Sequence, residues 1–180
     1  MSNFHPAPVT APSKANQVQQ PTGRVAIQGA RYQANDFAMT QLDGWTDKTL
    51  FTFSGPTTDG IQHTLAITVG HDVPFTTVRE FAEWQIATAG RELKGCTLLK
   101  KGNTALANGT AAYQAIFVWL PIDGLKVYQE QIFVLFEGTA YTLTATFSKK
   151  TRKTLGPQVE RMMLSFEPLK SKPRTQGAPK

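Results

Sequence analysis

The chain has 180 residues, of which 41% are hydrophobic and 18% are charged, so it carries enough apolar side chain to bury a core. No apolar run approaches the roughly 18 residues that cross a bilayer, and the first 30 residues lack the apolar segment of a signal peptide. These features predict a cytoplasmic protein that does not insert into the membrane. The single cysteine, Cys96, excludes an intrachain disulfide and a multi-cysteine zinc site, and it fits a reducing compartment.

The formal net charge of +6 is carried by the two ends of the chain. Residues 1–30 contain Lys14 and Arg24 and no acid, and four further cations follow position 168, whereas acids and bases balance between residues 31 and 167. A nucleic-acid-binding domain carries its positive charge on one face of the fold. The pattern therefore indicates that nucleic acid is not the partner.

Composition divides the chain into a single domain, residues 31–168, between a disordered arm over residues 1–30 and a disordered basic tail over residues 169–180. The domain is predicted to be α+β, an antiparallel sheet of about six to seven strands with helices packed on one face. Thr77 and Glu80 form a capping-box pattern that opens a helix over about 78–93. Pro157 suits the first turn of a later helix, with Val159, Met162 and Met163 on its buried side. The strands are expected at residues 32–39, 49–53, 65–69, 96–101, 110–122, 125–136 and 139–147.

The last three strands form a meander, with Asp-Gly at 123–124 and Glu-Gly at 137–138 between them. If both pairs are two-residue turns, the register follows, and Ile116 lies opposite Gln131. One face is then large and aromatic and is assigned to the core beneath the helices. It contains Tyr113, Ala115, Phe117, Trp119, Tyr128, Glu130, Ile132, Val134, Tyr141, Leu143 and Phe147.

The second predicted face mixes aliphatic side chains with amides and hydroxyls and has no formal charge. Such a surface suits a face that is covered only when an apolar partner binds. The alternative is permanent cover by a second helix layer or a dimer mate. Its predicted members are Gln114, Ile116, Val118, Leu120, Val127, Gln129, Gln131, Phe133, Leu135, Thr142, Thr144 and Thr146.

No pattern in the sequence predicts catalysis, a metal or a cofactor. His63 and His71 have no second ligand at metal-binding spacing and are expected in turns or on the surface. Cys96 has no histidine close to it in sequence, and phosphate-binding, dinucleotide-binding and nucleophile-elbow motifs are absent. We therefore expect a protein that is not an enzyme and that has no cofactor.

Four short motifs together resemble the DcrB-like domain family. Residues 37–49 are similar to its F-x-L-P-x-G-W-x-D-x-[ST] opening, and residues 127–131 are similar to its V-Y-Q-x-Q strand. Residues 141–146 resemble its L-T-x-T strand, and residues 163–166 resemble its closing hhxSF. The resemblance covers residues 32–167 and implies the PsbP/Mog1-like fold.

The cytoplasmic branch of this family includes the Eag chaperones of bacterial type VI secretion. The resemblance implies a homodimeric adaptor-chaperone that shields the apolar N-terminal helices of a secreted effector and helps to load it on the VgrG spike. A structural or scaffolding module of the same fold is the alternative, and an enzyme whose site assembles only in space is a third. By resemblance, Thr64 and Thr68 match hydroxyl positions, and Gln129 or Gln131 matches a glutamine position. Phe51 and Phe53 match an aliphatic pair, for which Leu50 and Thr52 are the alternative parity. The full predicted partner-binding set is Phe51, Phe53, Thr64, Thr68, Gln114, Ile116, Val118, Gln129, Gln131, Phe133 and Thr144.

Overall fold

The computed structural model describes residues 30–33, 37–42, 44–45, 47–58, 60–122 and 124–170. The chain divides into two compact units, Met1–Trp45 and Thr46–Lys180, which are described separately. In the first unit, β1 (Ala30–Gln33) pairs antiparallel with β2 (Ala38–Gln41). The single strand predicted over residues 32–39 is thus two short strands. The predicted arm and tail lie outside the described residues, except for positions 30, 169 and 170.

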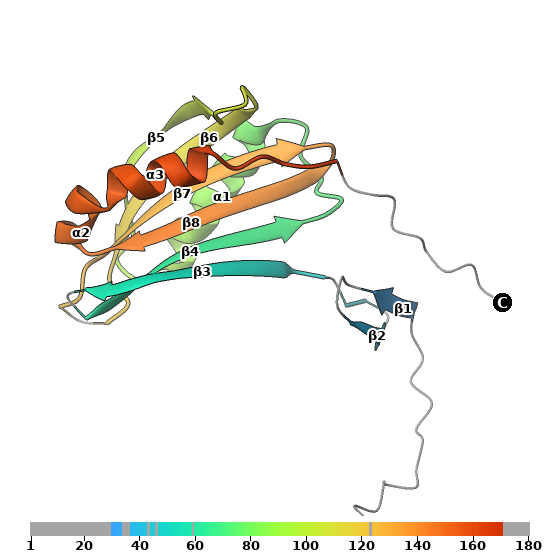
Figure 1. Cartoon of the computed structure of the whole chain (residues 1–180), viewed down its shortest axis with the longest axis horizontal. Helices are drawn as coiled ribbons and strands as arrows, with labels where there is room; N and C mark the ends of the chain where they lie inside the picture. The colour runs from blue at the N-terminus through green and yellow to red at the C-terminus, as the bar shows by residue number, and fades with distance from the viewer. Residues whose placement is uncertain are drawn as a thin grey trace, which may run out of the picture. The chain divides into compact units, whose positions relative to one another are not determined.

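The second unit is built on an antiparallel sheet with the strand order β3-β4-β8-β7-β6-β5 (Figure 1). This architecture confirms the α+β class. The strands are β3 (Thr49–Thr58), β4 (Ile61–Gly70), β5 (Thr97–Ala105), β6 (Ala111–Trp119), β7 (Val127–Phe136) and β8 (Thr139–Phe147), and the helices are α1 (Val78–Glu92), α2 (Lys149–Thr154) and α3 (Gly156–Leu164). The first two strands run well past their predicted ends, because their pairing resumes after an irregularity between Ser54 and Thr57.

Helix α1 begins at the predicted capping box. The Thr77 hydroxyl accepts the Glu80 backbone N–H at 3.2 Å, and the Glu80 carboxylate accepts the Thr77 N–H at 3.1 Å. Two amide groups that the first turn would leave without partners are thereby satisfied.

The β7–β8 hairpin has the predicted register, with Tyr128 opposite Phe147. Glu137 and Gly138 have φ values of 46° and 75°, as a two-residue hairpin turn with two left-handed positions requires. Here local turn chemistry alone predicted the pairing correctly.

The predicted β6–β7 register is wrong by one residue, because Ile116 lies opposite Glu130 rather than Gln131. A turn does form, with the Leu125 N–H bonded to the Ile122 carbonyl at 3.2 Å, but the strands stop pairing before they reach it. The Leu120 N–H instead donates to the Lys94 carbonyl at 2.9 Å, and the next residue is Pro121, which has no N–H to offer the ladder. A shift of one residue moves every side chain of a strand to the opposite face, so the predicted faces mix the two real ones.

Each face of the sheet has its own apolar core and its own helix cover. Helix α1 packs on the face that we name the α1 face, where the buried strand residues are Tyr113, Ala115, Phe117, Phe133 and Ala140. Helix α3 packs on the opposite face, the α3 face, against Leu65, Ala112, Ile132, Val134, Leu143, Ala145 and Phe147. Figure 1 shows α3 in front of β7 and β8, with α1 behind the sheet. Helices therefore cover both faces, whereas the sequence analysis predicted cover on one.

On α3, the buried side is narrower than predicted. Met163 is fully buried and Val159 packs against the same core, but Met162 is 46% exposed. Met162 is one residue before Met163 on the helix, so it points about 100° away from it.

Candidate partner-binding surface

Part of the α1 face extends beyond α1 over β3, β4, β8 and the start of β7. The strand registers place ten side chains together there, and we name this region the Thr/Gln surface. It consists of Leu50, Thr52, Thr64, Ala66, Thr68, Gln129, Gln131, Thr142, Thr144 and Thr146.

The Thr/Gln surface is open and carries no formal charge. Leu50 is 60% exposed, and Thr52 and Thr68 are also exposed. Gln129 and Gln131 are half-buried, and the Gln131 amide donates to the Thr144 hydroxyl at 3.3 Å. Short threonine and alanine side chains leave the sheet backbone accessible to a packed helix, while the hydroxyls and amides can hydrogen-bond its polar groups. The surface suits an uncharged partner with an apolar face.

Five of the eleven predicted partner-binding residues lie on this surface. They are Thr64, Thr68, Gln129, Gln131 and Thr144. A sixth, Phe133, is on the same face but is fully buried, because α1 covers it there.

The other five predicted residues lie on the opposite face. Gln114, Ile116 and Val118 move there with the one-residue shift of β6 against β7. Phe51 and Phe53 alternate with Leu50 and Thr52 along β3, and the pairing of Phe53 with Leu65 puts them on the α3 face. The parity alternative, Leu50 and Thr52, is therefore the pair on the Thr/Gln surface.

Besides Leu50 and Thr52, three residues of the surface were absent from the predicted binding set, namely Ala66, Thr142 and Thr146. Their common signal is the period of two along β4 and β8, where residues 64, 66 and 68 and residues 142, 144 and 146 are all small and uncharged. Of these, Thr142 is the most enclosed, at 8% exposed.

His63, His71 and Cys96 lie at three different places in the fold. His63 is buried on β4, not on the surface, because its strand extends through the predicted loop, and its Nδ1 lies 3.2 Å from the Thr146 carbonyl oxygen. His71 lies in the turn after β4, as expected. Burial raises the pKa of the Cys96 thiol, which lowers the fraction present as reactive thiolate. Within the ranges that the structure describes, no three histidine, cysteine or carboxylate side chains gather as a metal site would require.

No helix among the described residues is long and apolar enough to cross a membrane.

Comparison with known proteins identifies the family. The DcrB family model matches residues 38–165, and the chain belongs to this family. The chain is similar in structure to PA94 of Pseudomonas aeruginosa, described as a protein of unknown function and putative regulator, with a TM-score of 0.62 and 18% identity over 78% of this chain and 97% of that one. It also matches the cyanobacterial PsbP protein, CyanoP, of Synechocystis sp. PCC 6803, with a TM-score of 0.48 and 11% identity over 84% of this chain and 99% of that one. Mog1p, a Ran-binding protein of Saccharomyces cerevisiae, matches with a TM-score of 0.43 and 8% identity over 74% of this chain and 84% of that one. No curated protein sequence matches the chain.

Proposed function

We propose that this DcrB-family protein is a non-enzymatic, cytoplasmic adaptor-chaperone that holds apolar helices of a client protein on its Thr/Gln surface. The observation that carries the proposal is the open, uncharged stretch of sheet beside α1. The motif resemblance to the Eag chaperones indicates the client, a type VI secretion effector with apolar N-terminal helices that is handed to the VgrG spike. The regulatory role suggested for PA94 is compatible with an adaptor.

Binding would be helix-on-sheet burial. Leu50, Ala66 and the threonine methyl groups lose their contact with water when a helix covers them, which is favourable by about 25 cal/mol per Å² of apolar area. Gln129 and Gln131 can pair with any polar group that the client brings, so that neither side is left with an unsatisfied donor or acceptor. The site has no charge that would oppose an apolar helix.

We also infer that the protein is a homodimer joined at the outer edge of β3. This edge strand has no charged residue, and Leu50, Phe51 and Phe53 are each more than half exposed on it. The pairing of β3 with β4 becomes irregular after Ser54, and Pro56 has no N–H to donate to a further strand. The part of the edge that can pair with another strand is therefore residues 49–53. An exposed, uncharged edge strand presents backbone N–H and C=O groups that can pair with a strand of another chain. Antiparallel pairing of two copies would join two Thr/Gln surfaces into one continuous face.

The client proposal is tested with a charge placed on the surface. Thr68 is exposed, so Thr68→Lys is expected to fold normally yet lose the client, because an unpaired ammonium against an apolar helix costs several kcal/mol. Thr154→Lys, an exposed threonine at the end of α2, is the matched control.

The probe is a co-expressed fusion protein that carries one apolar helix of about 20 residues. The measurement is its recovery with the tagged chain after purification, with circular dichroism of each variant alone. Recovery with wild type and Thr154→Lys but not with Thr68→Lys supports the proposal. Equal recovery with both variants, or none with wild type, contradicts it.

A further inference from the structure

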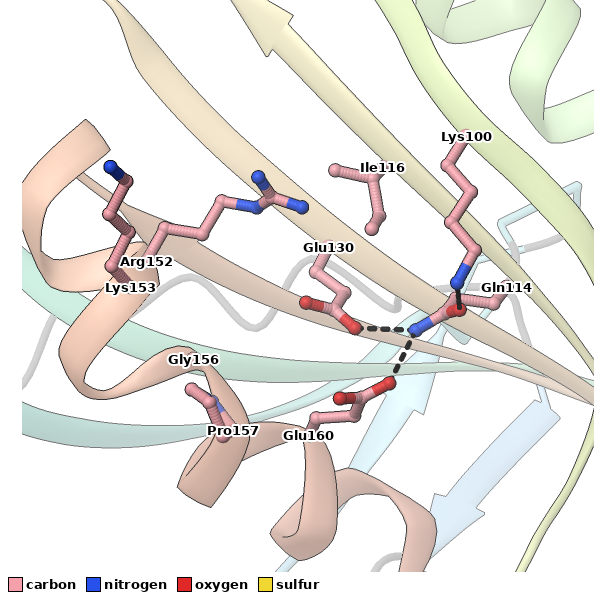
Figure 2. Close-up of a pocket in the computed structure, with 9 residues that line it drawn as sticks. All are labelled: Lys100, Gln114, Ile116, Glu130, Arg152, Lys153, Gly156, Pro157 and Glu160. Carbon is pink, nitrogen blue, oxygen red and sulfur yellow. Dashed lines mark hydrogen bonds between the residues drawn. The ribbon is translucent and has the colours of Figure 1, made fainter.

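A pocket lies on the α3 face, where α2 and α3 meet β5, β6 and β7 (Figure 2). It is an open pocket of about 400 Å³ and is lined by charged side chains of both signs, unlike the Thr/Gln surface. The proposed function uses none of them.

Two carboxylates in this pocket share one hydrogen-bond donor. The Gln114 side-chain nitrogen lies 2.5 Å from a Glu130 oxygen and 3.0 Å from a Glu160 oxygen, as the dashed lines in Figure 2 mark. Glu130 comes from β7 and is only 6% exposed, whereas Glu160 comes from α3 and is half-buried. The amide therefore ties α3 to the sheet through a pair of like-charged groups.

The cations of the pocket do not pair directly with these carboxylates. Lys100 on β5 donates to the Gln114 carbonyl oxygen at 3.3 Å, and the Arg152 guanidinium on α2 lies 5.7 Å from the centre of the Tyr128 ring. The Arg152 Nε is buried without a hydrogen-bond partner. Among the residues that the structure describes, no ion pair within 4.0 Å joins Glu130 or Glu160 to a cation.

The charged and titratable groups near Glu130 come from three elements. Lys100 faces it from β5, Arg152 and Lys153 line the pocket from α2, and Glu160 approaches from α3. On β8, the residue opposite Glu130 is Ala145, which does not titrate. Burial, and secondly the charge of Glu160, raise the pKa of the Glu130 carboxyl, against the smaller opposing effects of the Gln114 hydrogen bond and the two nearest cations.

We propose that the proton on Glu130, held beside the Glu160 carboxylate at the shared Gln114 amide, controls how tightly α3 is held on β6 and β7. With Glu130 protonated, only one negative charge lies at the Gln114 amide, and both carboxyl groups can remain on it. When the proton leaves, two negative charges face each other in a partly desolvated pocket, and Glu160 moves away with the first turns of α3. The protein thus has a pH-sensitive latch on the face opposite the Thr/Gln surface.

The sign of the effect follows from the direction of the shift. A carboxyl group whose pKa is higher in the folded than in the unfolded chain keeps its proton up to a higher pH in the folded state. The latch is therefore tight at low pH and loosens as the pH rises through the folded-state pKa of Glu130. This is the reverse of the usual behaviour of a salt-bridged carboxylate.

The test is hydrogen–deuterium exchange of the full chain between pH 5 and pH 8, with the protection of α3 expressed relative to α1 of the same molecule. In wild type, relative protection of α3 is expected to fall several-fold as the pH rises. Glu130→Gln keeps the shape and the hydrogen-bonding capacity of the side chain without its charge, so α3 is expected to remain protected at both ends of the range. The matched control is Glu92→Gln at an exposed position of α1, which should behave as wild type.

Glu160→Gln provides a second, independent arm, because this position is half-buried and tolerates the change even if Glu130→Gln fails to fold. Removing the Glu160 charge should also abolish the fall in α3 protection. A wild-type α3 whose relative protection is constant with pH would overturn the proposal, as would pH dependence that persists in Glu160→Gln. Neither result depends on a client, so failure here leaves the proposed chaperone function standing.

Discussion

Replacing Phe133 by alanine tests whether α1 covers the face of the sheet that carries Gln129 and Gln131, a face that the sequence predicted to be open. In the structure, Phe133 is fully buried beneath α1, and its ring meets the Phe81 ring edge-on, with centroids 5.8 Å apart and planes at 89°. In the arrangement predicted from the sequence, with helices on the opposite face alone, Phe133 would instead lie on the open face. The substitution should therefore lower the free energy of unfolding strongly in the first arrangement and only slightly in the second.

The expected loss of unfolding free energy follows from the complete burial of the Phe133 ring. Phe-to-Ala changes at fully buried positions cost about 3–5 kcal/mol, and the edge-to-face ring pair is part of that loss. We expect the midpoint of urea unfolding to fall by roughly 1–3 M, taking a slope of about 2 kcal/mol/M, and the melting temperature to fall by roughly 10–20 °C.

The assay is urea unfolding followed by circular dichroism, with Leu99→Ala as the control. Leu99 lies on β5 of the same sheet, away from the proposed dimer edge, and is 47% exposed, so its truncation should cost about 1 kcal/mol or less. Equal costs for the two variants would refute the assignment of Phe133 to the core beneath α1. A double-mutant cycle of Phe81 and Phe133 should also show a coupling of about 0.5–1.5 kcal/mol.

Three further predictions follow from the contacts. Ile116→Arg should unfold the free protein, because this side chain is 5% exposed beside Glu130; a variant with normal circular dichroism would contradict its placement. Thr77→Ala should lower the free energy of unfolding by about 0.5–2 kcal/mol in urea titrations, since it removes the cap of α1, and an unchanged midpoint would argue against that cap. The pKa of Glu83 is lowered by hydrogen bonds, first from Lys101 at 2.6 Å and then from Tyr113 at 2.9 Å. The stabilisation from these bonds is therefore present above the unfolded-state pKa of Glu83 and is lost as the pH falls through its lowered folded-state pKa. Tyr113→Phe should cost about 0.5–1.5 kcal/mol at pH 7 and less at pH 3, and a cost that does not change with pH would contradict the bond to the carboxylate.

Local patterns in the sequence determined the elements whose hydrogen bonds are satisfied close by in the chain. Thr77 and Glu80 specify the start of α1 because both partners of the capping box lie within one helical turn. Glu137 and Gly138 specify the β7–β8 register because both residues adopt the left-handed backbone that a two-residue turn requires. The same turn places Thr142, Thr144 and Thr146 of β8 together on one face, and Thr64 and Thr68 of β4 were predicted from the family resemblance.

Only the tertiary structure decided which strand faces share a surface. At the β6–β7 connection, the Leu120 N–H bonds to Lys94, which lies between α1 and β5, and not to β7. A contact between residues 26 positions apart in sequence leaves no signal in the local pattern around the Asp-Gly pair, yet it ends the ladder early and shifts the register by one residue. Because side chains alternate between faces, that single shift moves Ile116 from the predicted client surface to the carboxylate pocket on the other side of the sheet.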